Sequence, residues 1–417
     1  MNYDTIVIGA GLAGLMAAWA CARRGERVLV LAKGPGSTHW AAGSVDLLND
    51  TPLGDGPLAA LDRLLVARPD HPYRLVGATG ISEAFAQFRT LCADGGYPLA
   101  GNVAHTVQLP TAVGALRPTC LLPATMVAGD VRQWGDEPVL IAGFHELRDF
   151  FPPLIAANLR TQGYHVAATY LDLPPVGRRI DYSTATFARL FDRPDVRSAV
   201  ARQLHTAAKH HNAKRVGLPA VLGFSHALRA IYDLQSQSGV LIFEIPTLPA
   251  SIPGIRLFHL LEQALLRAGV RIQIGSLVLR GEGQQQHLAA IYSEAAAREQ
   301  RHEAQRYILA TGGILGGGLR ADHTGTLHEI ALNLPVHVPA PRTDWFNAQF
   351  LATAGHPVFR SGIAVDAQFR PLDADGQVVY HNVQVVGSAL AGADPIREGC
   401  LEGLAIATGW ASGERGT

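Results

Sequence analysis

The chain has 417 residues, of which 48% are hydrophobic and 17% are charged, and its 35 basic residues balance its 35 acidic ones. This composition excludes a disordered chain, and the zero net charge gives no long-range field that would recruit nucleic acid or anionic lipid. A chain of this length is expected to form about two domains.

Neither a membrane span nor a disulfide framework is predicted. No apolar run approaches the ~20 residues that a bilayer requires, and the expected first strand starts at residue 3, which leaves no room for a signal peptide. The four cysteines lie far apart and form no C-x-x-C pair, which predicts a reducing compartment and no metal or iron–sulfur site in this chain. We therefore expect a cytoplasmic protein.

The first candidate site lies within residues 3–15. Thr5–Ile8 is a short apolar run typical of a buried parallel strand, and residues 12–24 are rich in Ala and Leu, as in a helix. The glycines between them allow a tight turn, close approach of a phosphate to the backbone, and close packing of helix on strand. The expected contacts of a flavin or nucleotide phosphate at the helix N-terminus are Gly9, Ala10, Gly11, Leu12, Ala13 and Gly14.

The second expected strand, residues 27–31, lacks an acid at its end. A dinucleotide-binding unit usually places Asp or Glu there to bind a ribose hydroxyl, but this chain has Ala32, followed by Lys33 and Gly34. Either the ligand lacks an adenosine ribose, as FMN does, or a backbone group replaces the acid in an FAD site. We expect these three residues to contact the cofactor, and both FMN and FAD remain open at this point.

The Gly- and Ser-rich loop of residues 35–50 follows at the carboxyl edge of the expected sheet, where α/β proteins bind ligands. His39 is a candidate base near the redox centre, and a solvent-facing loop histidine is the alternative. The flavin contacts expected in this loop are Ser37, Ala42, Gly43 and Ser44.

Two arginines in the middle of the chain are candidate anion clamps. Helical sequence from 57 to 95 gives way to extended, Pro- and Thr-rich segments from 102 to 131, which predict β-rich material. Arg117 precedes a proline, which favours extended backbone and a guanidinium fixed for a carboxylate or phosphate. Arg256 follows a proline-stiffened turn and precedes a helix expected from Leu257. For both, a surface arginine is the alternative.

The last third of the chain returns to the first domain. A strand at 307–309 closes in Ala-Thr-Gly-Gly, which is typical of the second contact segment of a two-part flavin fold, and a last strand enters a glycine turn before a helix near Cys400. The N-terminus of that helix would stabilise the negative charge that collects at the pyrimidine edge of a reduced flavin. The contacts expected here are Ala310, Thr311, Gly312, Gly387, Ser388, Asp394, Cys400 and Leu401.

Together these patterns predict an α/β fold: a two-part, Rossmann-like FAD- or FMN-binding domain with an inserted β-rich α+β substrate or cap domain. The expected divisions are residues 1–100 and 256–417 for the flavin-binding domain and residues 101–255 for the insertion.

Over nearly its whole length the chain resembles the B-subunit family of anaerobic glycerol-3-phosphate dehydrogenase. The most specific segments of the resemblance are residues 42–48, His71-Pro72-Tyr73, 110–119, 246–257 and 387–400. The resemblance implies an FMN-bearing flavoprotein of the fumarate reductase and succinate dehydrogenase type. It also implies oxidation of sn-glycerol 3-phosphate to dihydroxyacetone phosphate. Electrons would pass toward a quinone through an FAD-containing A subunit and a membrane-associated iron–sulfur C subunit, which would place the chain at the inner face of the cell membrane.

If the oxidation takes place in this chain, Arg117 and Arg256 would clamp the phosphorylated polyol and His39 would take its hydroxyl proton. The chain departs from the family at residues 401–403, where many members carry a glycine run, and Ser388 stands where the wider fold often has an acid. The alternatives are a free-standing FAD-dependent oxidoreductase for another small acid or alcohol, and a flavin-fold scaffold subunit without turnover.

Overall fold

The computed structural model describes residues 3–49, 56–173, 182–295 and 298–416, and it divides into two compact units. Unit 1 comprises Met1–Thr38, Asp46–Leu91 and Leu260–Thr417, and unit 2 comprises His39–Val45 and Cys92–His259. The insertion therefore begins at Cys92 rather than at residue 101 and ends at His259 rather than at 255. Part of the loop after the second strand also belongs to unit 2.

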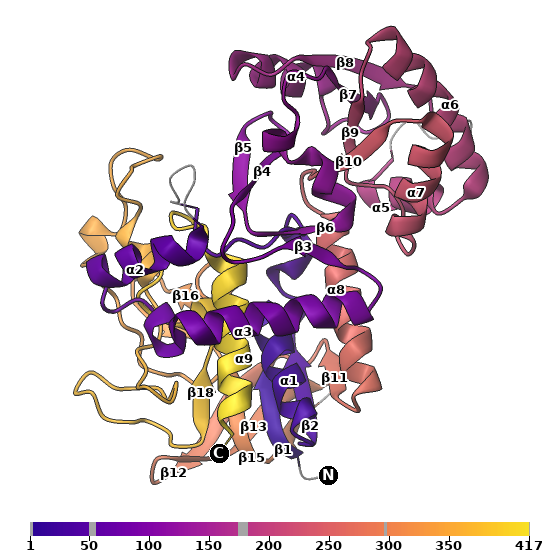
Figure 1. The fold of residues 1–417 in the computed structure, drawn as a ribbon. Coiled ribbons are helices and arrows are strands. Elements are labelled where there is room, and N and C mark those ends of the chain that lie inside the picture. Colours follow the sequence, from indigo (N-terminus) through magenta and orange to yellow (C-terminus); the bar gives the residue numbers. More distant parts are fainter. Residues whose placement is uncertain (1–2, 50–55, 174–181, 296–297, 417) are drawn as a thin grey trace. The chain divides into compact units, whose positions relative to one another are not determined.

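A parallel sheet in the order β11-β2-β1-β15-β18 forms the centre of unit 1 (Figure 1). Its strands are β1 (Tyr3–Ile8), β2 (Val28–Ala32), β11 (Arg271–Ile274), β15 (Ala304–Leu309) and β18 (Val383–Val385). In β1, Tyr3 is in register with Ala304 of β15, so the two ends of the chain build one sheet. The predicted two-part α/β domain is thereby confirmed.

Helices α1 (Leu12–Arg23) and α9 (Leu401–Arg415) lie side by side in unit 1 (Figure 1). They pack so closely that a Cβ at Gly409 would overlap the Ala13 carbonyl oxygen, and one at Gly413 would overlap the Ala20 side chain. Because the contacts advance in the same direction along both helices, the two run parallel. Eight residues of α9 precede Gly409, so at 1.5 Å per residue its N-terminus extends ~12 Å beyond the level of Ala13.

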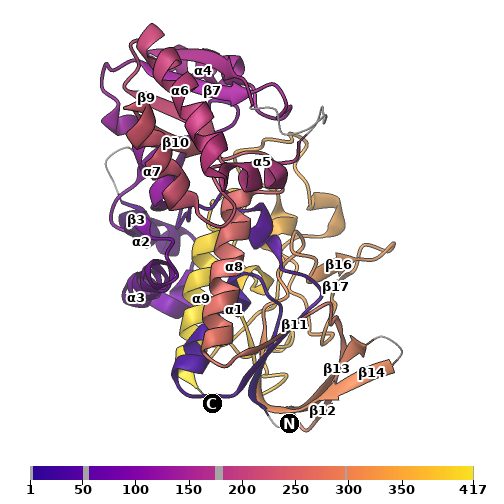
Figure 2. The same ribbon diagram turned by 90° about the vertical axis from the view of Figure 1, so that its right-hand side faces the viewer.

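The rest of unit 1 surrounds this centre. Its further helices are α2 (Pro57–Ala67) and most of α3 (Tyr73–Asp94), which is kinked at Gly77 (φ 72°). Its antiparallel strands are β12 (Val278–Gln284), β13 (His287–Ala295) and β14 (Arg298–His302), seen together in Figure 2, and the pair β16 (Leu319–Ala321) and β17 (Leu327–Glu329). The hairpin between β12 and β13 turns at Gln285 and Gln286, which both have positive φ.

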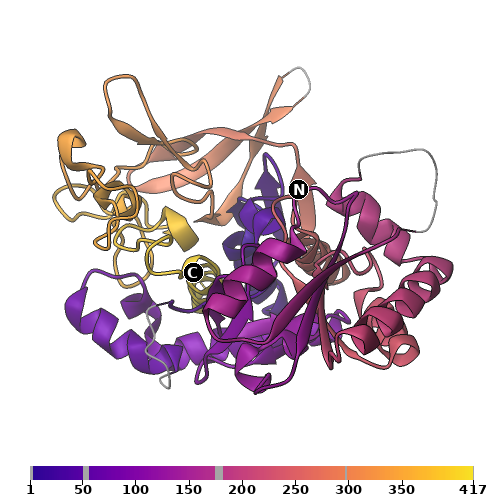
Figure 3. The same cartoon turned by 90° about the horizontal axis from the view of Figure 1, so that it is seen from above.

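Unit 2 is built on a parallel sheet in the order β10-β9-β7-β8. The strands are β7 (Val139–Phe144), β8 (Val166–Leu171), β9 (Arg215–Pro219) and β10 (Leu241–Ile245). The helices are α4 (Pro152–Thr161), α5 (Thr184–Phe191), α6 (Pro194–His210), α7 (Ala227–Ser238) and the first half of α8 (Ile252–Arg267). Because parallel connections are right-handed, α4 covers one face of the sheet and α6 and α7 the other (Figure 3).

The expected β-rich character is limited to the start of unit 2. There β3 (Leu99–Gly101) pairs with β6 (Leu121–Pro123), and β4 (Val107–Pro110) pairs with β5 (Leu116–Thr119). The remainder of the unit alternates apolar strands with helices and is α/β. The sequence prediction gave too much weight to the proline- and threonine-rich segment at 102–131, which forms only these short pairs.

Candidate functional site

The turn between β1 and α1 presents the N-terminus of α1. A Cβ at Gly9 (φ 118°) would overlap the Ala310 carbonyl oxygen, and one at Gly14 would overlap the Gly9 carbonyl oxygen, whereas one at Gly11 would meet no atom within 4 Å. Within the described ranges, no side chain caps α1 and its first turn holds no acidic residue. The backbone N–H groups of that turn are therefore available to an anion next to Gly11.

The later glycine segments lie against this turn. Ala310 follows β15 and touches Gly9, and the Gly313 N–H donates to Ser388 Oγ at 3.1 Å. Gly387 (φ 69°) has no room for a side chain, because its Cβ would lie 2.8 Å from Ala13 Cβ. The structure thus brings together the segments at 9–14, 310–313 and 387–388, which the sequence analysis assigned to one cofactor.

The loop after β2 passes beside the same turn. Ala32 is buried and its carbonyl oxygen accepts the Ser276 N–H at 2.9 Å, while Lys33 is exposed. A Cβ at Gly36 (φ 70°) would lie 2.7 Å from Gly11 Cα, so this part of the loop, between Gly34 and Ser37, packs directly on the glycine turn. A carboxylate is missing at the end of β2, as expected from the sequence.

A flavin fits the polar groups of unit 1. Thr38 Oγ1 and Thr311 Oγ1 are buried and have no hydrogen-bond partner among the described residues. An unsatisfied buried hydroxyl costs ~1–3 kcal/mol, which a ligand with phosphate, ribityl or ring polar groups would offset. One of these hydroxyls lies in the loop after β2 and the other in the segment after β15, on the two sides of the α1 N-terminus.

The last expected contacts lie just before α9. Asp394 Oδ1 accepts the N–H groups of Ile396 (3.2 Å) and Arg397 (3.0 Å), so its carboxylate closes a turn of the protein. The Cys400 Sγ lies 3.6 Å from Glu398 Oε2. Burial, reinforced by Glu398, raises the pKa of the Cys400 thiol well above its ordinary value and keeps it protonated. Leu401 then begins α9, which no side chain caps in the described part of the chain.

Within unit 2, the segment His39–Val45 is fixed by contacts with the start of α8. The His39 carbonyl oxygen accepts the Ser251 N–H at 3.1 Å, and the His39 ring lies 4.8 Å from the Phe258 ring in an edge-to-face contact. A Cβ at Gly43 (φ 86°) would overlap Pro253. Ala42 is half-buried and Ser44 buried. His39 is thus a half-buried, packed residue, unlike the solvent-facing loop histidine that was the alternative.

Arg117 lies in the β4–β5 hairpin, where its Cα is in register with Leu109. The side chain is half-buried. The extended backbone that its proline neighbour predicts is confirmed by this strand.

The structure places Arg256 differently from the expectation. Helix α8 already begins at Ile252, so Arg256 lies in a helix and not in a stiff loop; a proline is well tolerated in the first turn of a helix. Its guanidinium pairs with Glu244 (Nη1–Oε2 2.8 Å, Nη2–Oε1 3.0 Å) and donates from Nε to the Gly223 carbonyl oxygen at 2.8 Å. This buried arginine is committed to the protein, and the expectation that it clamps a substrate anion was wrong.

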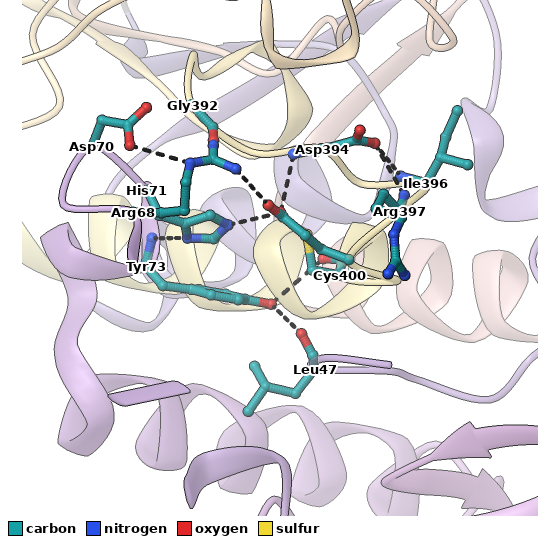
Figure 4. A network of polar contacts seen from close by, with 11 residues as sticks. Leu47, Arg68, Asp70, His71, Tyr73, Gly392, Asp394, Ile396, Arg397 and Cys400 are labelled. Carbon is teal, nitrogen blue, oxygen red and sulfur yellow. Dashed lines mark hydrogen bonds and ion pairs between the residues drawn. The ribbon is translucent and has the colours of Figure 1, made fainter. Parts of the chain in front are cut away.

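Sequence reasoning gave no role to Arg68, His71 and Glu398, which form a partly buried cluster before α9; Figure 4 labels Arg68 and His71 of this cluster. His71 was noticed only as part of a motif, and its partner Glu398 lies 327 residues away in the chain. A contact over that distance leaves no periodicity or spacing from which a single sequence could predict it.

In the described ranges, no helix combines the length and apolar character that a membrane crossing requires.

Comparison with known proteins gives three kinds of match: to a family model, to related proteins and to a solved structure. Residues 4–404 match the family model described as FAD binding domain. The B subunit of anaerobic glycerol-3-phosphate dehydrogenase from Yersinia enterocolitica is 31% identical over 97% of this chain and 96% of that protein. A probable B subunit of the same dehydrogenase from Halobacterium salinarum is 32% identical over 98% of this chain and 96% of that protein. The match to a solved flavocytochrome c3 fumarate reductase in its open conformation covers 100% of this chain and 78% of the chain in that structure. Its TM-score is 0.46 and the sequence identity is 9%.

Proposed function

The chain belongs to the FAD-binding-domain family and, within it, to the B subunits of anaerobic glycerol-3-phosphate dehydrogenase, and on this basis we propose its function. It is a flavin-dependent oxidoreductase subunit that oxidises sn-glycerol 3-phosphate to dihydroxyacetone phosphate and passes the electrons toward a quinone through partner subunits. The observation that carries the flavin part is the uncapped N-terminus of α1, enclosed by Gly9, Gly14 and Ala310.

The chemical identity of the flavin is the finer part of the proposal. The family model describes an FAD-binding domain, which supports FAD, whereas Ala32 and Lys33 at the end of β2 offer no carboxylate to an adenosine ribose. We propose FMN on the second observation alone. The test is to purify the chain without added flavin, denature it and separate the released cofactor by chromatography. Release of FAD would refute FMN and assign the ribose to backbone groups near Gly34.

When bound, the flavin supplies the acceptor for a hydride from the substrate carbon. The residues of this chain would hold the substrate and take the hydroxyl proton. We propose His39 as the base, because it is half-buried and is fixed by Ser251 and Phe258. We propose Arg117 as the group that binds the substrate phosphate, because a planar guanidinium on a rigid hairpin suits an oxyanion.

Replacing Arg117 tests where the substrate binds. Arg117→Ala should raise KM for sn-glycerol 3-phosphate by ~10–100-fold, as expected for the loss of one charged hydrogen bond worth ~1.5–3 kcal/mol, while the flavin content stays unchanged. Stopped-flow reduction of the bound flavin by substrate measures this. Arg193→Gln, in an exposed ion pair of the same unit, is the control. If Arg117→Ala keeps the full rate of flavin reduction at low substrate concentration, Arg117 does not bind the substrate phosphate.

The relatives are named as subunits of a dehydrogenase, and we propose that this chain likewise assembles with an FAD-containing A subunit and a membrane-associated iron–sulfur C subunit. An apolar segment of unit 1 supports assembly: the side chains of Phe346, Phe350 and Leu351 are 62%, 88% and 85% exposed, and no charged residue lies between Asp344 and His356. Exposed apolar side chains grouped in this way are typical of protein interfaces. Its place at the membrane would then come from its partners.

A further inference from the structure

A largely buried carboxylate, that of Glu398, lies three residues before Leu401, the first residue of α9. Glu398 Oε1 is 3.1 Å from Arg68 Nη1, and Glu398 Oε2 is 3.1 Å from His71 Nε2 and 3.0 Å from the Asp394 N–H. The side chains of His71 and Glu398 are 0% and 11% exposed. We call Arg68, His71 and Glu398 the Glu398 cluster; Figure 4 shows the polar contacts around it.

The donor atoms of His71, Glu398 and Cys400 lie within 4.8 Å of one another, which resembles a set of metal ligands. The hydrogen bonds argue for a different role. The Tyr73 N–H donates to His71 Nδ1 at 3.2 Å, so the ring proton is on Nε2 and is donated to Glu398. A metal on Nε2 would need that proton removed or moved to Nδ1, against a backbone donor. Arg68 already supplies the positive charge that Glu398 requires.

The Glu398 cluster connects the beginnings of two helices. Through Nδ1 the His71 ring accepts from the first residue of α3, and through Nε2 it holds Glu398, just before α9. Tyr73 is that first residue. Its hydroxyl donates to the Leu47 carbonyl oxygen at 3.0 Å and lies 3.5 Å from the Cys400 carbonyl oxygen. The segments containing His71-Pro72-Tyr73 and Gly399-Cys400, which the sequence analysis could only note as motifs, therefore meet at one place.

We propose that the Glu398 cluster positions the N-terminus of α9 and that the balance between its two opposite charges maintains the reduction potential of the bound flavin. The inference rests on the proposed function, in which the α9 N-terminus stabilises the negative charge of the reduced flavin. Because α9 is parallel to α1 and extends ~12 Å beyond it, its N-terminus lies on the same side as the phosphate site and farther from the α1 turn. Arg68 and Glu398 are positioning residues in this view and need no contact with the substrate.

The two charges of the cluster should act in opposite directions. Glu398→Gln removes a negative charge and leaves the Arg68 guanidinium uncompensated, which favours the reduced, more negative flavin and raises the potential. Arg68→Gln leaves the Glu398 carboxylate uncompensated and therefore lowers the reduction potential of the flavin. Since charges in a partly buried site are weakly screened, we expect about a tenfold change in the ratio of reduced to oxidised flavin at fixed reference potential, which is ~30 mV for a two-electron couple.

The experiment is a redox titration of the purified, flavin-bearing chain against a reference dye, together with the melting temperature of the flavin-free protein. The variants are Glu398→Gln, Arg68→Gln and the double variant, in which the charges balance again and the potential should return to within the error of the unsubstituted chain. The controls are Asp4→Asn and Arg27→Gln, an ion pair of 2.8 Å at the opposite end of β1 in the same unit, whose loss should leave the potential unchanged.

A purely structural role of the cluster gives a different result. Loosening α9 would lower the melting temperature in both single variants and would shift both potentials in the same direction, and that outcome, or shifts no larger than those of the controls, overturns the inference. If Glu398→Gln does not fold, the double variant decides, because a tenfold or larger change in its flavin equilibrium contradicts charge compensation. A chain that binds no flavin would refute the proposed function as well, whereas same-sign shifts in a flavin-bearing chain refute only the inference.

Discussion

Arg256 illustrates how burial decides what a charged side chain can do. Burial by itself would lower the pKa of this guanidinium, but the Glu244 carboxylate reverses the effect and raises it, so the arginine stays charged inside the protein. Glu244 in turn accepts the Leu222 N–H at 2.9 Å and the Thr125 hydroxyl at 2.7 Å. The pair joins the start of α8 to β10 and to the loop after β9, and four of the five N–H groups of the guanidinium donate to Glu244 and Gly223.

Removing one member of this pair should destabilise unit 2 strongly. Glu244→Gln leaves a buried arginine without its counter-ion, for which ~3–5 kcal/mol is the usual cost. Urea unfolding followed by circular dichroism measures the loss. Asp195→Asn, which breaks the exposed Arg193–Asp195 pair, should leave the unfolding midpoint unchanged. A midpoint for Glu244→Gln equal to that of Asp195→Asn would contradict the assignment of a structural role to Arg256.

The neighbouring Tyr97 predicts how stability depends on alkaline pH. Burial raises the pKa of Tyr97 to about 12, from an ordinary value near 10. Between these values the unfolded chain releases the phenolic proton while the folded chain keeps it, so the free energy of unfolding falls as pH rises through this window. Tyr97→Phe should remove that part of the fall, on the order of 2 kcal/mol, while the stability at pH 7 changes little. Urea midpoints of both proteins at pH 8, 10 and 11 test this, and parallel pH profiles would disprove it.

At the scale of elements, two glycines of the β1–α1 turn are needed for different physical reasons. Gly14 is required for packing, because its Cβ would overlap the Gly9 carbonyl oxygen, whereas Gly11 has an ordinary φ of −73° and open space around it. That open space is where a phosphate would approach the backbone. One glycine therefore serves the fold and the other the ligand.

Alanine substitutions at these two positions should give different phenotypes. Gly11→Ala should leave the melting temperature of the flavin-free protein within a few degrees and weaken flavin binding at least about tenfold, because the new methyl group occupies the approach to the N–H groups. Gly14→Ala should lower both the melting temperature and the affinity for flavin, since overpacking against backbone costs ~1–3 kcal/mol. Quenching of flavin fluorescence on titration with flavin-free protein gives the affinities. Equal flavin affinity for Gly11→Ala and the unsubstituted chain would argue against a phosphate at this turn.

Local elements were accessible from the sequence because their causes are local. The strand, the glycines at 9, 11 and 14, and the following helix lie within a few residues of one another. Arg256 was misassigned for two reasons. Its partner, Glu244, lies in β10, outside the helix that contains Arg256, and this helix begins at Ile252, inside the proline-rich segment that was expected to be a loop. The Glu398 cluster was out of reach for the same reason, as it joins residues 327 and 330 positions apart.

For the whole molecule, the exposed segment at 346–351 predicts how the chain assembles. Phe350→Ser combined with Leu351→Ser should leave flavin content and melting temperature unchanged, because both side chains are already exposed, and should weaken association with the partner subunits by ~10-fold or more. Co-purification with co-expressed A and C subunits, and sedimentation of the isolated chain, are the measurements. Tyr232→Ser removes an aromatic side chain that is 62% exposed in unit 2 and should not affect assembly. Undiminished co-purification would place the interface elsewhere.

The pairing of β1 with β15 also bears on how the chain is made. Tyr3 of β1 pairs in register with Ala304 of β15. At ~5–20 residues per second, a ribosome that has added Tyr3 needs a further ~15–60 s to add Ala304. Throughout this time β1, which buries Thr5–Ile8, and the all-apolar strand β2 lack the neighbour that completes their sheet, while the strands of unit 2, contiguous in sequence, can already pair. The nascent chain is thus expected to depend on a chaperone that holds its first 40 residues or so until the second half of the domain emerges, and slower translation would lengthen that dependence.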